Sequence, residues 1–131
     1  MGKKKYLIDT NITIYYFGLV LNQESVEFLE NVFKSKYYIS VINRIELLGT
    51  KNLTARQSKA LESFINNAII FNLEEKIVVK TIELRRNYNI KLPDAIIAAT
   101  CLINECSLIT NNQKDFNKID GLDILPLGMN A

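Results

Sequence analysis

Short apolar runs alternate with longer stretches in which apolar residues recur at helical spacing. Apolar runs of three or four residues predict buried strands, and recurrence every three or four residues predicts amphipathic helices. The expected strands are 6–8, 37–40, 68–71 and 107–110, and residues 123–125 could add an edge strand. The expected helices are 11–21, 24–34, 40 or 43 to 48, 54–66, 74–87 and 94–105, with a helical turn or loop at 115–117.

This alternation predicts an α/β fold with a parallel or mixed sheet and helices on both faces. The 131 residues, 48% of them hydrophobic, contain no repeat or linker and predict a single domain over 1–131. In such sheets, sites form beyond the carboxyl ends of the strands. Asp9 directly follows the first predicted strand, and Thr110 ends the fourth.

Composition excludes several kinds of chemistry. A net charge of +2 gives no overall basic field of the kind that attracts duplex DNA. The chain has no histidine, which removes histidine bases, nucleophile activation and metal ligands. Cys101 and Cys106 lie in an apolar stretch read as helical, match no zinc spacing, and are expected to be buried free thiols in a reducing cytoplasm.

The apolar run near the N-terminus is short. Only residues 6–8 separate the N-terminal lysines from Asp9, too few for a signal peptide or a membrane-spanning helix. We therefore expect a soluble cytoplasmic protein without a membrane partner.

Four acidic residues stand at junctions between apolar runs and the next element: Asp9, Glu46, Asp94 and Asp115. Carboxylates within apolar sequence are costly to bury without a compensating positive charge. If the fold brings them together, a divalent metal ion is the simplest compensation.

Each acid taken alone has a structural interpretation. Asp9 could cap a helix, Asp94 could interact with a helix dipole, and Asp115 could cap the turn at Phe116. Glu46 could pair with Arg44, although its apolar neighbours argue against simple solvation. The functional hypothesis therefore depends on the joint placement of the four acids.

Four segments carry a family resemblance. They are 7–11, 40–49, 92–100 and 108–116, and together they span almost the full length of the chain. In this order and at these separations, the chain resembles the PIN-domain ribonucleases, and within them the VapC-type toxins of bacterial toxin–antitoxin pairs.

The resemblance implies a PIN-like three-layer α/β/α sandwich with a mainly parallel sheet of four to five strands. It implies an endoribonuclease that depends on Mg²⁺, with Mn²⁺ as an alternative, and that acts on RNA. The implied partners are a cognate antitoxin bound across the region of Tyr15, Tyr16 and Phe17, and a second copy in a homodimer. The acidic core of the implied site consists of Asp9, Glu46 and Asp94. Asn112 and Asp115 share a fourth metal position. Asn11 and Thr110 are polar residues that brace the site.

Clustered carboxylates favour such a metal on physical grounds. Two carboxylates about 4 Å apart repel by ~4 kcal/mol at an effective dielectric of ~20, so a cluster takes up protons or binds a cation. Without metal, at least one acid should have a raised pKa. Oxygen ligands select Mg²⁺ or Mn²⁺. We expect water to attack phosphorus and leave a 5′-phosphate and a 3′-hydroxyl.

Arg85, Arg86 and Lys91 form a local positive cluster near Asp94. A solvated helix end is the simplest interpretation, and guidance of RNA phosphates is the alternative.

Two further functional classes compete with the nuclease. Asn112, at a position where many relatives carry aspartate, motivates a degenerate PIN-like module that binds RNA or a partner without cutting. A nucleotide-binding domain or phosphatase is disfavoured because the five glycines are scattered and form no phosphate loop.

Overall fold

The computed structural model describes residues 4–131, in which five parallel strands form one sheet in the order β3-β2-β1-β4-β5. The strands are β1 (Lys5–Ile8), β2 (Tyr38–Ser40), β3 (Ile69–Phe71), β4 (Cys106–Ile109) and β5 (Ile124–Leu125). Every strand predicted from the apolar pattern is present, including the edge strand.

Seven helices connect the strands within the described residues. They are α1 (Thr10–Phe17), α2 (Gln23–Lys34), α3 (Val41–Leu48), α4 (Ala55–Asn67), α5 (Glu75–Asn87), α6 (Leu92–Asn104) and α7 (Gln113–Phe116). Ser40 and Thr54 begin α3 and α4 with capping boxes, and Pro93 lies in the first turn of α6.

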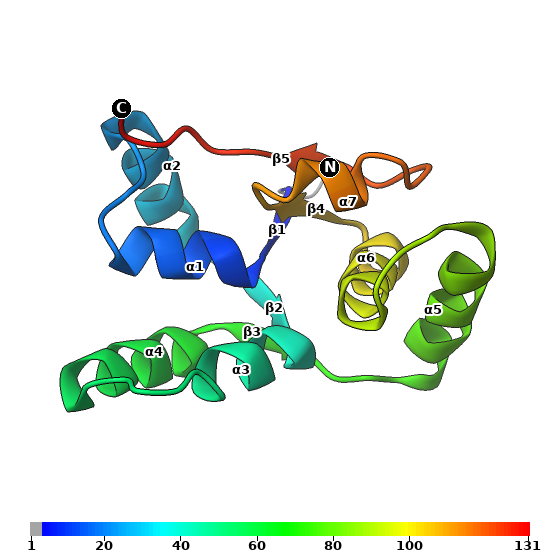
Figure 1. Ribbon diagram of the computed structural model, residues 1–131, viewed down its shortest axis with the longest axis horizontal. Helices are drawn as coiled ribbons and strands as arrows, with labels where there is room; N and C mark the ends of the chain where they lie inside the picture. The colour runs from blue at the N-terminus through cyan, green and yellow to red at the C-terminus, as the bar shows by residue number, and fades with distance from the viewer. Residues whose placement is uncertain (1–3) are drawn as a thin grey trace.

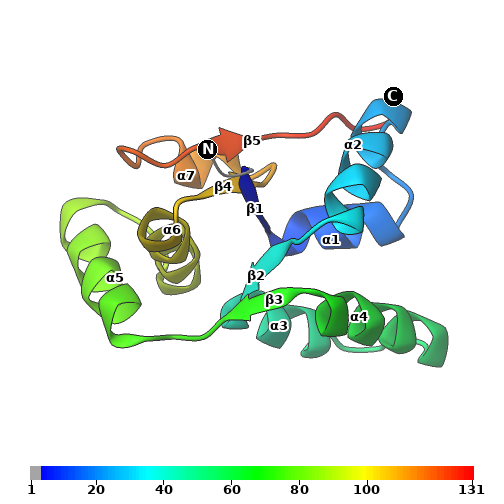
Figure 2. The same ribbon diagram turned by 180° about the vertical axis from the view of Figure 1, so that it is seen from behind.

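The helices lie on both faces of the sheet. Leu7 and Leu108 pack with apolar residues of α5 and α6 on one face, whereas Ile8, Ile39 and Ile109 pack with residues of α1 to α4 on the other. In Figure 1, β1 runs between α1 and α6, and Figure 2 shows the same order from behind. The predicted three-layer α/β/α sandwich is confirmed, with a fully parallel sheet.

Two predicted boundaries were wrong. The first helix ends at Phe17 instead of residue 21, because the Gly18 amide closes the last turn on the Ile14 carbonyl (2.9 Å) and Leu19 adopts a left-handed φ of 59°. The chain then turns, and Leu21 forms an isolated antiparallel bridge with Met129, so the C-terminal segment lies beside α2 (Figure 1).

The helical stretch assigned to both cysteines ends between them. Glu105 has a left-handed φ of 56° and ends α6, so Cys101 is helical and Cys106 begins β4. Both thiols are free and buried, as expected.

Across residues 4–131, no helix is long and apolar enough to cross a membrane.

Candidate functional site

Asp9 lies at the carboxyl end of β1, where neighbouring strands bring their ends to the same edge. Ile8 pairs with Ile109, and the Asp9 amide donates to the Ile109 carbonyl (3.0 Å). The side chain is only 5% exposed. Its Oδ1 accepts from the Thr10 amide (2.9 Å), which makes Asp9 the N-cap of α1, as the structural interpretation expected.

The second carboxylate oxygen of Asp9 is bound from two sides. Oδ2 accepts from the Thr110 hydroxyl (2.7 Å) and from the Asn11 side-chain amide (3.1 Å). Burial raises the pKa of Asp9, whereas the bonds from Thr110 and the Thr10 amide oppose that rise. Both residues predicted to brace the site therefore contact Asp9 directly.

Asn43 and Thr10 join this network, although neither was among the site residues predicted from the sequence. Asn43 is fully buried, and its side-chain carbonyl accepts from the Ser40 amide (2.8 Å). Its amide nitrogen reaches the Thr10 hydroxyl (3.0 Å) and Asp9 Oδ1 (3.4 Å). The Thr10 hydroxyl in turn donates to Glu46 Oε1 (2.6 Å). Asn43 precedes Glu46 by three residues on α3, and this spacing was the signal that could have found it.

Glu46 makes no ion pair with Arg44 or with any other residue that the structure describes. Its hydrogen bond from Thr10 instead ties the exposed end of α3 to the corner between β1 and α1. The pairing interpretation of Glu46 is therefore wrong.

Asp94 lies in the first turn of α6 and is half-buried. Burial and the charges of Asp9, Asp115 and Glu46 raise its pKa to about 6, and Lys91 opposes the rise. The pKa of Asp94 is thus raised, as predicted for an acid of such a cluster, although burial contributes more than the neighbouring charges. Asp9, Glu46 and Asp115 all lie near enough for their charges to act on Asp94.

Asn112 and Asp115, the two candidates for the fourth position, contact each other. The Asn112 side-chain amide donates to Asp115 Oδ2 (2.9 Å), and the Asn112 backbone amide donates to the Thr110 hydroxyl (3.0 Å). Asn112 thus links Asp115 to Thr110.

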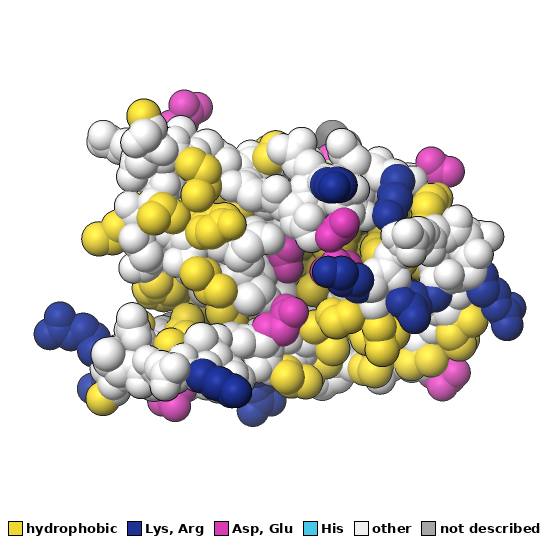
Figure 3. Space-filling view, in the orientation of Figure 1, with side chains coloured by type: hydrophobic (Ala, Val, Ile, Leu, Met, Phe, Trp, Pro, Cys, Tyr) yellow, Lys and Arg dark blue, Asp and Glu magenta, His cyan; other side chains and the backbone are white. Residues whose placement is uncertain are grey.

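No positive side chain among residues 4–131 forms an ion pair with this cluster, although Lys91 is near enough to lower the pKa of Asp94. The ion pairs among residues 4–131 join Lys4 to Asp123 and Lys80 to Glu83, both outside the cluster. In Figure 3, acidic side chains gather near the centre of the face shown. Hard carboxylate and amide oxygens without a paired cation are a donor set that suits Mg²⁺ or Mn²⁺.

The carboxylates do not form a closed set of metal ligands. Within the described chain, no group of three acidic or cysteine side chains stands close enough to hold one ion jointly. Mg²⁺ keeps several waters and binds one or two carboxylates directly, so it does not require three converging carboxylates. The donor set therefore fits this ion.

The three predicted cations differ in their contacts. Lys91 is near enough to Asp94 to lower its pKa. The Arg85 guanidinium donates to the Ile90 carbonyl (2.7 Å) in the loop before α6. Arg86 is exposed. Arg85 is therefore not simply a solvated helix end.

An apolar groove of about 420 Å³ lies between α1, α3 and α4, on the side of the acidic cluster away from α5. Ile14, Phe17, Leu53 and Leu61 contribute to its lining. Phe17 is 41% exposed, and its ring also packs against Phe64. Part of the aromatic run of α1 is thus accessible.

Comparison with known proteins identifies relatives of the whole chain. The PIN domain family model matches residues 6–122. A toxin–antitoxin complex from Klebsiella pneumoniae contains a chain with 31% identity and a TM-score of 0.75, covering 92% of this chain and 96% of that one. VapBC-1 from nontypeable Haemophilus influenzae has 25% identity and a TM-score of 0.72, with the same coverages.

A third structure supports the fold alone. DNA-bound VapBC from Salmonella typhimurium has 24% identity and a TM-score of 0.77, covering 95% of this chain and 98% of that one. No curated protein sequence matches the chain. The predicted resemblance to VapC-type toxins is confirmed, and the chain belongs to the PIN-domain family.

Proposed function

We propose that the protein is a Mg²⁺-dependent endoribonuclease and the toxin of a type II toxin–antitoxin pair. The observation that carries the proposal is that Asp9, Glu46 and Asp115 lie near enough to Asp94 for their charges to raise its pKa, while none of the four acids forms an ion pair with a described residue. Family membership supports it independently.

The proposed metal ligands are Asp9 and Asp94, with Glu46 and Asp115 acting directly or through water. Mg²⁺ or Mn²⁺ bound there would lower the pKa of a water and offset charge on the phosphodiester oxygens. Thr110, Asn11 and Asn43 orient Asp9 by hydrogen bonds. Asn112 orients Asp115, which we assign to the fourth position.

Cleavage of a fluorescent single-stranded RNA tests the activity. We expect cleavage with Mg²⁺, loss of cleavage in EDTA, and a loss of about 100-fold or more in Asp94→Asn, because removing a group that stabilises developing charge commonly has effects of this size. Asp120→Asn removes an exposed carboxylate outside the cluster and should leave cleavage unchanged.

The second candidate is a PIN-like module that binds RNA or a partner without cutting it. Two observations favour it: an amide occupies position 112, and no three described acids are close enough to hold one ion jointly. RNA binding without cleavage at any level of Mg²⁺ or Mn²⁺ would support this function over the nuclease.

The proposed protein partner is an antitoxin. Support comes from the relatives, which are found in toxin–antitoxin complexes, and from the apolar groove between α1, α3 and α4. A small reading frame beside the gene, encoding a DNA-binding protein, would support this pairing. The cytoplasmic location and the homodimer remain predictions; sedimentation of the purified chain tests the homodimer.

A further inference from the structure

A second hollow lies on the opposite flank of the acidic cluster from the apolar groove. It has a volume of about 540 Å³, within the range of ligand sites, and lies between α5 and the loop leading to α6. Its lining includes Ile82, Arg86, Tyr88, Asn89 and Leu92. Leu92 is the first residue of α6 and lies two residues before Asp94. The hollow therefore lies at the same end of α6 as Asp94.

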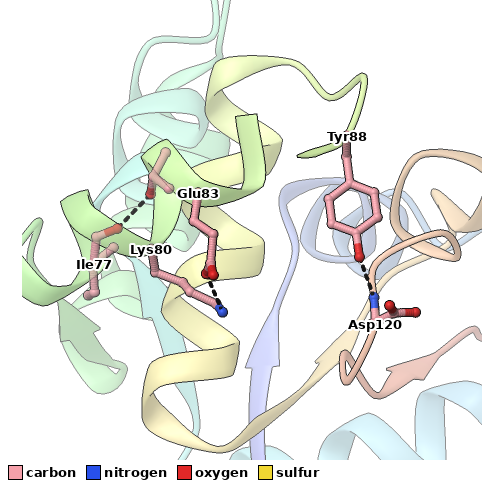
Figure 4. Close-up of polar contacts among 6 residues, drawn as sticks. Ile77, Lys80, Glu83, Tyr88 and Asp120 are labelled. Carbon is pink, nitrogen blue, oxygen red and sulfur yellow. Dashed lines mark hydrogen bonds and ion pairs between the residues drawn. The ribbon is translucent and has the colours of Figure 1, made fainter. Parts of the chain in front are cut away.

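The loop that forms one wall is fixed by three contacts, one from α5 and two from the segment between α7 and β5. The Tyr88 hydroxyl accepts from the Asp120 amide (3.2 Å), and Figure 4 shows the ring reaching across to that segment. The Arg85 guanidinium donates to the Ile90 carbonyl (2.7 Å). Lys118 Nζ donates to the Asn89 carbonyl. A wall held in this way is preformed, which reduces the entropy lost when a ligand binds.

Arg86 supplies a positive charge that forms no ion pair with any described residue. Its neighbour Arg85 is bound to the loop, and Lys80 on the same helix pairs with Glu83 (2.6 Å; Figure 4). Arg86 is exposed and makes neither an ion pair nor a side-chain hydrogen bond within residues 4–131. A guanidinium suits a phosphate because it can donate two parallel hydrogen bonds.

Apolar side chains are exposed beside this charge. Ile82 is 47% exposed and Leu92 is 53% exposed, and both line the hollow. Single exposed apolar residues are ordinary, but an apolar surface next to a free guanidinium matches an unpaired nucleotide. Such a nucleotide carries a flat base and a charged phosphate, and proteins that bind single strands recognise both features.

No charged residue occurs from Thr10 to Gln23, so α1 offers no positive charge to a polyanion. Basic side chains in Figure 3 appear on the side of the acidic centre that α5, α6 and α7 form and also over α3 and α4, where Arg56 lines the apolar groove. A polyanion at the acidic cluster therefore meets positive charge beside α5 and α6 but none on α1.

We infer that this hollow is a nucleotide subsite for single-stranded RNA, in which Arg86 binds a backbone phosphate and Ile82 and Leu92 contact a base beside the cleavage site. The inference rests on the proposed function, because it extends the RNA path from the acidic cluster.

Fluorescence anisotropy with a short fluorescein-labelled single-stranded RNA of mixed sequence, in EDTA, measures binding without cleavage. Arg86→Gln should lower the affinity about 5-fold and make the dependence of log K on log salt less steep by about 0.7, the value for one phosphate contact on a single strand. Leu92→Ala should lower the affinity about 3-fold at an unchanged slope, because a base contact releases no counterions.

Lys59→Gln is the matched control. Lys59 is an exposed cation on α4, and its removal changes the net charge as Arg86→Gln does. The control should keep the wild-type affinity and slope. Thermal unfolding of all three variants verifies that each is folded.

Several outcomes overturn the inference. One is wild-type binding by both Arg86→Gln and Leu92→Ala, and another is the absence of RNA binding by the wild-type chain. A third is dissociation of a dimer by Ile82→Ala in sedimentation, which would assign this surface to contact between two copies.

The experiment also separates this inference from the proposed nuclease activity. RNA binding that weakens in the variants, without cleavage in Mg²⁺ or Mn²⁺, supports the subsite and contradicts the nuclease. Cleavage by the wild-type chain, together with unchanged RNA binding by the variants, supports the nuclease and overturns the subsite.

Discussion

Asp9 and Asp94 belong to the same acidic cluster, but their surroundings differ. Asp9 accepts hydrogen bonds from Thr10, Asn11 and Thr110, and Asn43 approaches it as well. Asp94 accepts no hydrogen bond from any residue that the structure describes, and burial and neighbouring negative charges raise its pKa to about 6. The fold thus surrounds Asp9 with donors that partly offset its burial, and it provides no such donors for Asp94.

Because of this difference, Asp9 and Asp94 should affect stability differently even though both are proposed to bind the metal. Removing Asp9 leaves buried donors without an acceptor, whereas neutralising Asp94 relieves repulsion. Two acids with the same proposed role in metal binding should therefore have opposite effects on the free energy of unfolding.

The largest expected effect is on stability in the absence of metal. Asp9→Ala should lower the free energy of unfolding by about 3 kcal/mol, because several buried donors lose a charged acceptor. Asp94→Asn should raise it by about 1 kcal/mol at pH 7.5, after the pKa shift is discounted for the partial exposure of the carboxyl. Urea denaturation in EDTA measures both. Asp120→Asn is the control. Destabilisation by Asp94→Asn would contradict the expected opposite effects of the two acids on the free energy of unfolding.

Thr110→Val isolates one hydrogen bond to Asp9. Thr110 is fully buried, and its hydroxyl donates to Asp9 Oδ2. Its replacement should lower the free energy of unfolding by about 2 kcal/mol and raise the pKa of Asp9 further, because a charge-assisted bond is lost. Thr110→Ser keeps the hydroxyl and should be milder. Equal losses in the two variants would indicate packing as the cause.

The pH dependence should depend on Asp94. Its pKa is about 6 in the folded protein against an ordinary value of 3.8, so the folded state binds the proton more tightly than the unfolded chain. The free energy of unfolding without metal should therefore increase as the pH falls from 7.5 to 5, by about 1 kcal/mol after allowance for exposure. This increase in the free energy of unfolding is lost as the pH rises through 6.

The same denaturation series in Asp94→Asn tests this assignment. The increase between pH 7.5 and 5 should shrink in the variant, because the asparagine side chain cannot take up the proton that Asp94 binds. An undiminished increase would assign the titration to another group.

The smallest expected effect is stabilisation by Mg²⁺. At a few times its dissociation constant, a ligand of the folded state adds roughly 0.5–1 kcal/mol. The increase in melting temperature with Mg²⁺ should be larger at pH 7.5 than at pH 5.5, because protons compete for Asp94. Asp94→Asn should remove most of the increase, and Asp120→Asn should retain it.

The local pattern was enough to predict the strands, because short apolar runs are buried on both faces of a parallel sheet. It was insufficient at the end of α1. Leu19, Val20 and Leu21 continue an apolar pattern, but Leu19 turns the chain with a left-handed φ and Leu21 pairs with Met129. This pairing spans more than a hundred residues, so no local window contains it.

The sequence by itself determined which carboxylates could meet. Asp9 and Thr110 each follow a predicted parallel strand, and Asp94 opens a helix whose apolar residues require burial. The tertiary structure alone decided which donors reach them. Asn43 and Thr10 contact Asp9 and Glu46 because β1 pairs with β2 in one register, and Asp115 faces Asp94 because α7 packs against α6. Hydrogen bonds and charge interactions depend on distances of a few ångströms, and only the packed chain sets those distances.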